Sequence, residues 1–108
     1  MFTEIFGSSP QTKILDFLAD HPRYDYSISD IARNAEVSRP TVYKIVDVFL
    51  KKDLIVKTRK SGNSSLFKLN CENSIVKVIL KFDFELASRL AAKNNQETIR
   101  VKPQMASS

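Results

Sequence analysis

The segment from Ile28 to Leu50, ISDIARNAEVSRPTVYKIVDVFL, limits what this chain can fold into more than any other part of it. Apolar residues recur at helical spacing over residues 28–35 and again over residues 38–52. Only Glu36-Val37 lies between the two runs as a turn. The pattern therefore predicts two short helices joined by a tight turn.

A helix-turn-helix needs two helices held at a fixed angle. Small and apolar residues where the two predicted helices cross would hold them in this way. Ile31 and Ala32 face inward from the first helix, and Ala32 is small where the helices approach. Val37 fills the turn, while Val42 and Ile45 anchor the second helix. The polar residues left outward on the second helix are then free to meet a partner.

Helix-end signals agree with this placement. Ser27-x-x-Asp30 resembles a capping box at the start of the first helix. Ser38 is expected to cap the second helix, with Pro40 in the first turn, where its missing N–H does no harm.

Other local patterns extend the prediction along the chain. Ser9-Pro10 begins a helix over residues 10–20, and residues 24–28 form a short β-like piece such as a single bridge. Two strand-like runs within residues 55–69 flank a turn at residues 61–64. The second helix of the pair is therefore followed directly by a hairpin.

Composition restricts the class of protein. The chain has 108 residues, 43% of them hydrophobic, which suits one domain with a modest core. No apolar run approaches the roughly 18 residues of a membrane span, and the first ten residues do not resemble a signal peptide. One cysteine, Cys71, allows no internal disulfide. We expect a cytoplasmic, nucleoid-associated protein with no membrane partner.

The net charge of +5 is unevenly distributed. Residues 1–38 carry a balance of −3, whereas residues 39–60 carry seven basic side chains against two acidic ones, a balance of +5. The basic excess begins where the second helix begins. Clustered positive charge is typical of a nucleic-acid-binding surface, although a solvated basic surface is the plainer alternative.

The outward residues of the second helix suit the major groove of DNA. Arg39 is the best candidate for a base edge, because a guanidinium can bond two acceptors of guanine. Tyr43 suits a thymine methyl group or a phosphate, and Thr41 and Lys44 a phosphate or a nearby base. Free N–H groups at the helix start, around Ser38, suit phosphate, and Pro40 would add apolar contact. The alternative is that Arg39 and Lys44 are merely solvated and Tyr43 packs on a neighbour.

The hairpin adds a basic, polar tip over residues 58–65. Arg59, Lys60 and Asn63 are the residues expected to contact the minor groove or flanking phosphates. An ordinary hairpin with charged ends is the alternative.

From Ser9 to Asn70 the chain resembles winged helix-turn-helix transcription regulators of the broad MarR and ArsR type, especially small archaeal ones. The similarity lies in SPQTKILDFL, SISDIARNAEVSRPTVYKIV and KKDLIVKTRKSGNSSLFKLN. It implies that Arg39, Thr41, Tyr43 and Lys44 meet DNA and that the hairpin is a basic wing.

This sequence differs from the usual pattern of these regulators at two places. Glycine often precedes the turn position of Val37, whereas this chain has Glu36. ArsR-type metal sensors use clustered Cys, His and carboxylate ligands, whereas Cys71 and His21 are far apart in this sequence. We therefore expect no metal site within one subunit and no cofactor.

A helical stripe near the C-terminus predicts dimerisation. One face would cover the domain's own core, and the remaining width exceeds what so small a domain needs. Phe2, Ile5 and Phe6 can join this face, and a helix that only completes a monomer core is the alternative. The residues expected at the interface are Ile75, Ile79, Phe82, Leu86 and Leu90.

The sequence as a whole predicts a mainly α fold with a small β-hairpin wing, a winged helix-turn-helix with a C-terminal dimerisation helix. Residues 1–72 would bind DNA, residues 73–93 would dimerise, and residues 94–108 would form a polar, partly disordered tail. The expected function is that of a homodimeric regulator on palindromic double-stranded DNA, with recognition helix 38–52 and wing 58–65. The alternatives are a DNA-organising or plasmid-partition protein and a protein-interaction module; no catalytic constellation suggests an enzyme.

Overall fold

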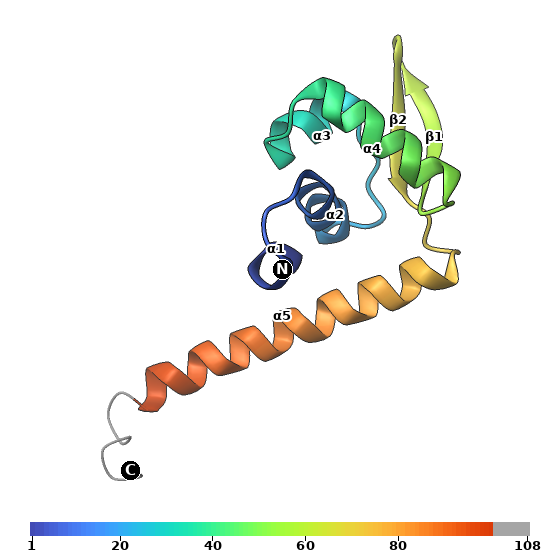
Figure 1. Ribbon diagram of the computed structural model, residues 1–108. Helices are drawn as coiled ribbons and strands as arrows, with labels where there is room; N and C mark the ends of the chain where they lie inside the picture. Colours follow the sequence, from blue (N-terminus) through green and yellow to red (C-terminus); the bar gives the residue numbers. More distant parts are fainter. Residues whose placement is uncertain (101–108) are drawn as a thin grey trace.

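A helical domain carrying a β-hairpin rests on one long helix in the computed structural model, which describes residues 1–100 and the side chains of residues 1–93 (Figure 1). The fold class expected from the sequence is confirmed. In chain order the elements are α1 (Phe2–Phe6), α2 (Pro10–Asp20), α3 (Ile28–Ala35), α4 (Arg39–Lys51), β1 (Ile55–Ser61), β2 (Ser64–Leu69) and α5 (Ser74–Arg100).

The core lies where α2, α3 and α4 meet. Ile14, Ile31 and Val42, one from each helix, have no exposed surface. Burying such a side chain fully contributes about 1.5–3 kcal/mol, so this contact stabilises the three-helix arrangement strongly. Ile55 and Leu69 extend the same core to the base of the hairpin.

The helix caps predicted at Ser9 and Ser27 form as expected. The Ser9 hydroxyl accepts from the Thr12 N–H, and Ser27 and Asp30 make both bonds of the capping box. Ser38 occupies the cap position of α4, but its hydroxyl donates to Thr41 Oγ1 at 2.9 Å and accepts no backbone N–H. The predicted cap bond is therefore wrong, although Ser38 does occupy the cap position.

The hairpin is antiparallel and contains an irregularity that the sequence did not indicate. Gly62 turns the chain with φ 63°, a left-handed conformation that suits glycine. The register shifts between Lys57 and Arg59, which leaves Thr58 as an extra residue in β1. Tyr26 exchanges two backbone hydrogen bonds of 2.8 Å with Phe67, so the predicted single bridge adds a short third segment beside β2.

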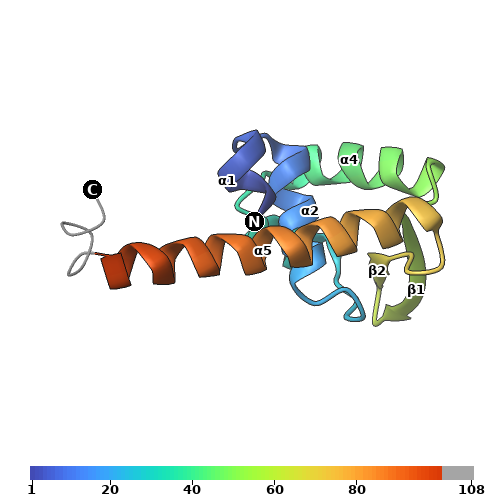
Figure 2. The same ribbon diagram turned by 90° about the horizontal axis from the view of Figure 1, so that it is seen from below.

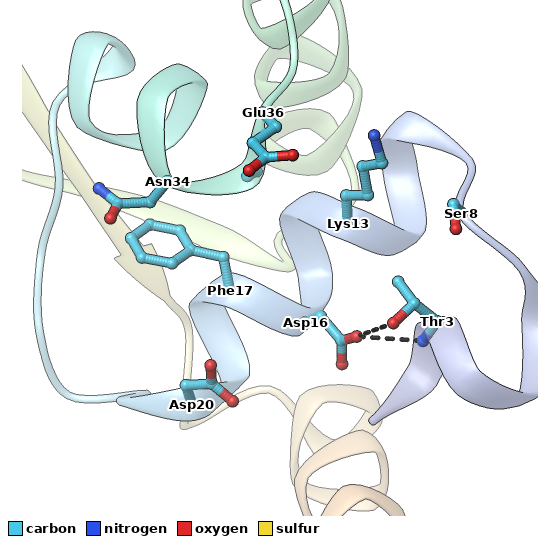
Figure 3. Close-up of a pocket in the computed structure, with 9 residues that line it drawn as sticks. Thr3, Ser8, Lys13, Asp16, Phe17, Asp20, Asn34 and Glu36 are labelled. Atoms are coloured by element: carbon cyan, nitrogen blue, oxygen red, sulfur yellow. Dashed lines mark hydrogen bonds between the residues drawn. The ribbon is translucent and has the colours of Figure 1, made fainter.

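The short helix α1 was not predicted. Asp16 of α2 fixes its first turn by accepting from the Phe2 N–H at 2.7 Å. It also accepts from the N–H and Oγ1 of Thr3 at 3.0 and 2.9 Å (Figure 3). On the other side, the Phe2 ring stacks on Phe82 of α5 with centroids 6.0 Å apart. Helix α1 therefore joins α2 to α5.

Helix α5 runs beneath the domain and continues beyond it (Figure 2). Val76 is buried, and Ile79 and Leu80 pack against the core, so the start of α5 completes the domain. The helix extends to Arg100, past the expected end at residue 93. Of the expected tail, residues 101–108 lie outside the described residues.

Replacing Asp16 tests the attachment of α1. Burial alone would raise the pKa of Asp16, but hydrogen bonds from the N-terminal amine, Thr3 and Phe2 outweigh it and hold the pKa below its ordinary value. Asp16→Asn should lower the free energy of unfolding by about 1–3 kcal/mol at pH 7. Because the folded-state pKa is depressed, this contribution is complete above about pH 4 and disappears as the pH falls through the folded pKa.

Chemical denaturation of both proteins at several pH values measures this difference. Asp20→Asn, an exposed position on the same helix, is the control and should be nearly neutral. An Asp16→Asn effect that persists unchanged at pH 2 would contradict the role of the carboxylate.

Candidate nucleic-acid interface

The turn between α3 and α4 has the geometry that the sequence left in question. Glu36 adopts a left-handed conformation, with φ 58° and ψ 49°. The Val37 N–H donates to the Ala32 carbonyl at 3.0 Å and closes the end of α3. Glu36 thus adopts the left-handed conformation that glycine usually provides at this position, and the helix-turn-helix forms without a glycine.

One face of α4 is fixed in the core and the other is open to solvent. Val42, Ile45 and Val46 are buried and set the rotation of the helix. Tyr43 is 56% exposed, so more than half of its side chain is open to solvent. The other predicted contact residues of α4 also lie on the surface: Ser38, Arg39, Pro40 and Lys44 are exposed, and Thr41 is half-buried.

A cleft of about 290 Å³ lies between the start of α4 and the hairpin. It brings together three residues predicted separately from the sequence, namely Arg39, Tyr43 and Asn63. It also contains Ser64 and Ser65 of the predicted wing. Sequence reasoning did not assign Ser27 and Ser29 to the site, because only the fold places the start of α3 beside the hairpin. The complete lining is Ser27, Ile28, Ser29, Arg39, Tyr43, Asn63, Ser64, Ser65 and Phe67.

The chemistry of this cleft favours an anion. Its lining offers hydroxyl groups, one amide and one guanidinium, and it contains no carboxylate. Such a set can donate several hydrogen bonds to phosphate oxygens.

The predicted hairpin residues do not all lie in the cleft. Lys60 is exposed further along β1. Arg59 donates through Nε to Asp25 Oδ2 at 3.2 Å, and Asp25 belongs to the loop before α3. The pKa of Asp25 lies below its ordinary value, because Arg59 and then Thr58 donate hydrogen bonds to it. The separation of 34 residues explains why no local pattern indicated this partner.

A second pocket, of about 330 Å³, shares none of its lining with the cleft (Figure 3). Asp16, Asp20 and Glu36 contribute carboxylates to it and Lys13 an amine. This acidic lining disfavours a nucleic acid. Within the described residues no cluster of three or more His, Cys, Asp or Glu side chains is placed to hold a metal ion. Nor is any described helix both long and apolar enough to pass through a membrane.

The sequence model of the MarR family matches residues 8–64, more than half of the chain. The chain belongs to the MarR family. A comparison with curated proteins gives no significant match. The matched region contains α2, α3, α4 and β1, so the family assignment covers the helix-turn-helix and the first strand of the wing.

Solved structures share the fold of this MarR-family chain. MepR, a transcription regulator of the Staphylococcus aureus multidrug efflux pump MepA, is 19% identical with a TM-score of 0.61, over 92% of this chain and 78% of that one. The adhesin competence repressor AdcR from Streptococcus pyogenes is 14% identical with a TM-score of 0.65, over 88% and 69%. A homodimeric winged helix-turn-helix domain from Mycobacterium bovis, a possible ArsR-family regulator, is 16% identical with a TM-score of 0.56, over 76% and 70%. The archaeal subtype stays a prediction.

Glu36→Gly tests whether the left-handed turn is a point of strain in this MarR-family domain. A non-glycine residue in this left-handed conformation destabilises the folded state by about 1–2 kcal/mol. Glycine removes this strain, but it loses more conformational entropy on folding, which offsets part of the gain. We expect a net gain of about 0.5–1 kcal/mol in the free energy of unfolding, measured by denaturation. The control Asn34→Gly, inside α3, should lose about 1 kcal/mol. Equal losses in both variants would show that Glu36 is not strained.

Proposed function

We propose that this chain is a homodimeric transcriptional regulator that binds specific sequences in double-stranded DNA. Membership of the MarR family supports the general role of a DNA-binding transcriptional regulator. The observation that carries the proposal is the carboxylate-free cleft between α4 and the hairpin, flanked by exposed basic residues. A regulator of this kind would act on the chromosome, in the cytoplasm, and needs no enzymatic activity.

In this proposal α4 enters the major groove. Arg39, exposed in the first turn, reads a base edge such as guanine, and Tyr43, one turn later, contacts a thymine methyl group or a phosphate. Ser38, Pro40, Thr41 and Lys44 surround them and contact backbone or neighbouring bases. The buried anchors of α4 fix this orientation before DNA arrives, which reduces the entropy lost on binding.

The hairpin reaches the adjacent minor groove or its phosphates. Arg59, Lys60 and Asn63 are the contacts proposed for it. The serines of the cleft contact the phosphates of the DNA strand that lies between the two grooves. Several phosphate contacts of this kind make affinity fall steeply with salt concentration.

Dimerisation through α5 completes the proposal. Ile75 is 59% exposed and Phe82 45%, although Phe82 already stacks on Phe2, and Ile79 is partly used by the domain's own core. A groove of about 370 Å³ on α5, lined in part by Val78, Phe82 and Leu86, adds apolar surface beside them. The Mycobacterium bovis neighbour is homodimeric. We propose Ile75, Ile79, Phe82, Leu86 and Leu90 as the interface, with residues 1–72 as the DNA-binding part and residues 73–93 as the dimerising part.

Leu86→Glu tests the dimer. A charge placed in an apolar interface should convert the dimer to a monomer in sedimentation or light-scattering measurements, and binding to a palindrome should weaken at least tenfold. Ser88→Glu introduces the same charge on the opposite side of α5, by helical spacing, and should leave the dimer intact. A wild-type protein that is monomeric at tens of micromolar would contradict the proposal.

Selection from random duplex pools tests specificity, at low and moderate salt. The wild-type protein should enrich a palindrome with half-sites about 10 bp apart. Arg39→Ala should abolish the enrichment, because it removes a base contact worth about 1–3 kcal/mol of discrimination. The control Arg33→Ala removes the same charge from α3, where Arg33 pairs with Asp30, and should keep the preference.

The remaining outcomes distinguish the alternatives. Equal and cooperative binding to all sequences would indicate a DNA-organising protein. No binding at either salt concentration would favour a protein-interaction module.

A further inference from the structure

Asp25 is the point where the loop before α3 is joined to the wing through side chains. Its carboxylate oxygen Oδ2 accepts from Thr58 Oγ1 at 2.7 Å and from Arg59 Nε at 3.2 Å. The next residue, Tyr26, is locked to Phe67 of β2 by two backbone hydrogen bonds. The position of Asp25 is therefore fixed by the sheet itself.

The irregularity in β1 creates this contact. Thr58 is the extra residue between the pairs Lys57–Phe67 and Arg59–Leu66. A bulge bends its strand and redirects the side chains beside it. The Thr58 hydroxyl lies 3.3 Å from the Leu66 carbonyl but only 2.7 Å from Asp25, so its single proton is directed to the carboxylate.

The contact with Asp25 occupies only one nitrogen of the Arg59 guanidinium. Asp25 engages Nε, and within the described residues the terminal nitrogens of Arg59 make no other hydrogen bond or ion pair. The Arg59 side chain remains 68% exposed, whereas Asp25 is only 21% exposed. One end of the guanidinium is anchored while the other remains open to a ligand.

We infer that Asp25 is a positioning residue for DNA binding, which with Thr58 holds Arg59 oriented toward the minor groove before DNA arrives. The inference rests on the proposed function. A free arginine loses considerable rotamer entropy when it is fixed against DNA, and an anchored one has lost part of it already. The negative potential of a narrow minor groove also attracts an inserted arginine.

Simple electrostatics predicts the opposite effect of removing Asp25. An acidic side chain near DNA repels phosphate, so its loss should strengthen binding. Positioning predicts that the loss weakens binding even though the protein becomes more positive. The sign of the change therefore separates the two roles.

Thr58→Val and Asp25→Ala test the inference on the selected palindrome, with dissociation constants measured over a range of salt. Thr58→Val removes the hydroxyl at nearly constant shape and charge, and valine suits a strand. Both variants should bind about three- to tenfold more weakly, and Thr58→Ser should restore the affinity. Asp47→Ala, which removes an exposed carboxylate paired with Lys51 on α4, is the charge control and should bind as well as wild type or better.

A double-mutant cycle completes the test. In an Arg59→Ala background, Asp25→Ala should cause no further loss, because the residue that it positions is absent. Thermal unfolding of each variant shows whether a loss of binding reflects a loss of folding; additive losses in folded variants would overturn the inference. Unchanged or tighter binding by Asp25→Ala, with a wild-type protein that binds its palindrome, would also overturn it. A wild-type protein that binds no DNA would instead overturn the proposed function.

Discussion

The burial of three aliphatic side chains at the crossing of α2, α3 and α4 is the contact on which the remaining structure depends. Ile14, Ile31 and Val42 have no exposed surface. Through Val42 this contact sets which face of α4 is outward, and through Ile55 and Leu69 it holds the base of the hairpin. The surface proposed for DNA is therefore positioned by residues that cannot touch DNA themselves.

Features that depend on neighbours in the sequence were predictable. The capping box at Ser27 and Asp30, the helix that begins after Ser9 and the hairpin turn at Gly62 all follow from residue types within a few positions of each other. The outward face of α4 followed from helical spacing in the same way, although its contacts with DNA stay proposed.

Features that depend on distant partners were not predictable. Helix α1 is held by Asp16 and Phe82. A helix of five residues is not stable by itself and is too short for a helical repeat to be recognised in the sequence. The ion pair of Arg59 depends on Asp25, which only the folded loop brings near, and the bulge at Thr58 is a matter of pairing between two strands. The Ser38 hydroxyl donates to Thr41 and accepts no backbone N–H, whereas Ser9 contacts the Thr12 hydroxyl and also accepts the Thr12 N–H, so residue types alone did not distinguish the two caps.

Within the described residues the outer edge of β1 is open, and the outer edge of β2 is paired only at Phe67. Tyr26 pairs with Phe67 on the β2 side, whereas no described strand pairs with the outer edge of β1. An open edge is a template on which copies of a protein can polymerise, and natural proteins block it with charge and with bulges. Lys57, Arg59 and Lys60 lie along β1 together with the bulge at Thr58. The basic hairpin thus also protects the free protein against edge-to-edge aggregation, and selection for solubility would retain these charges even where no DNA is bound.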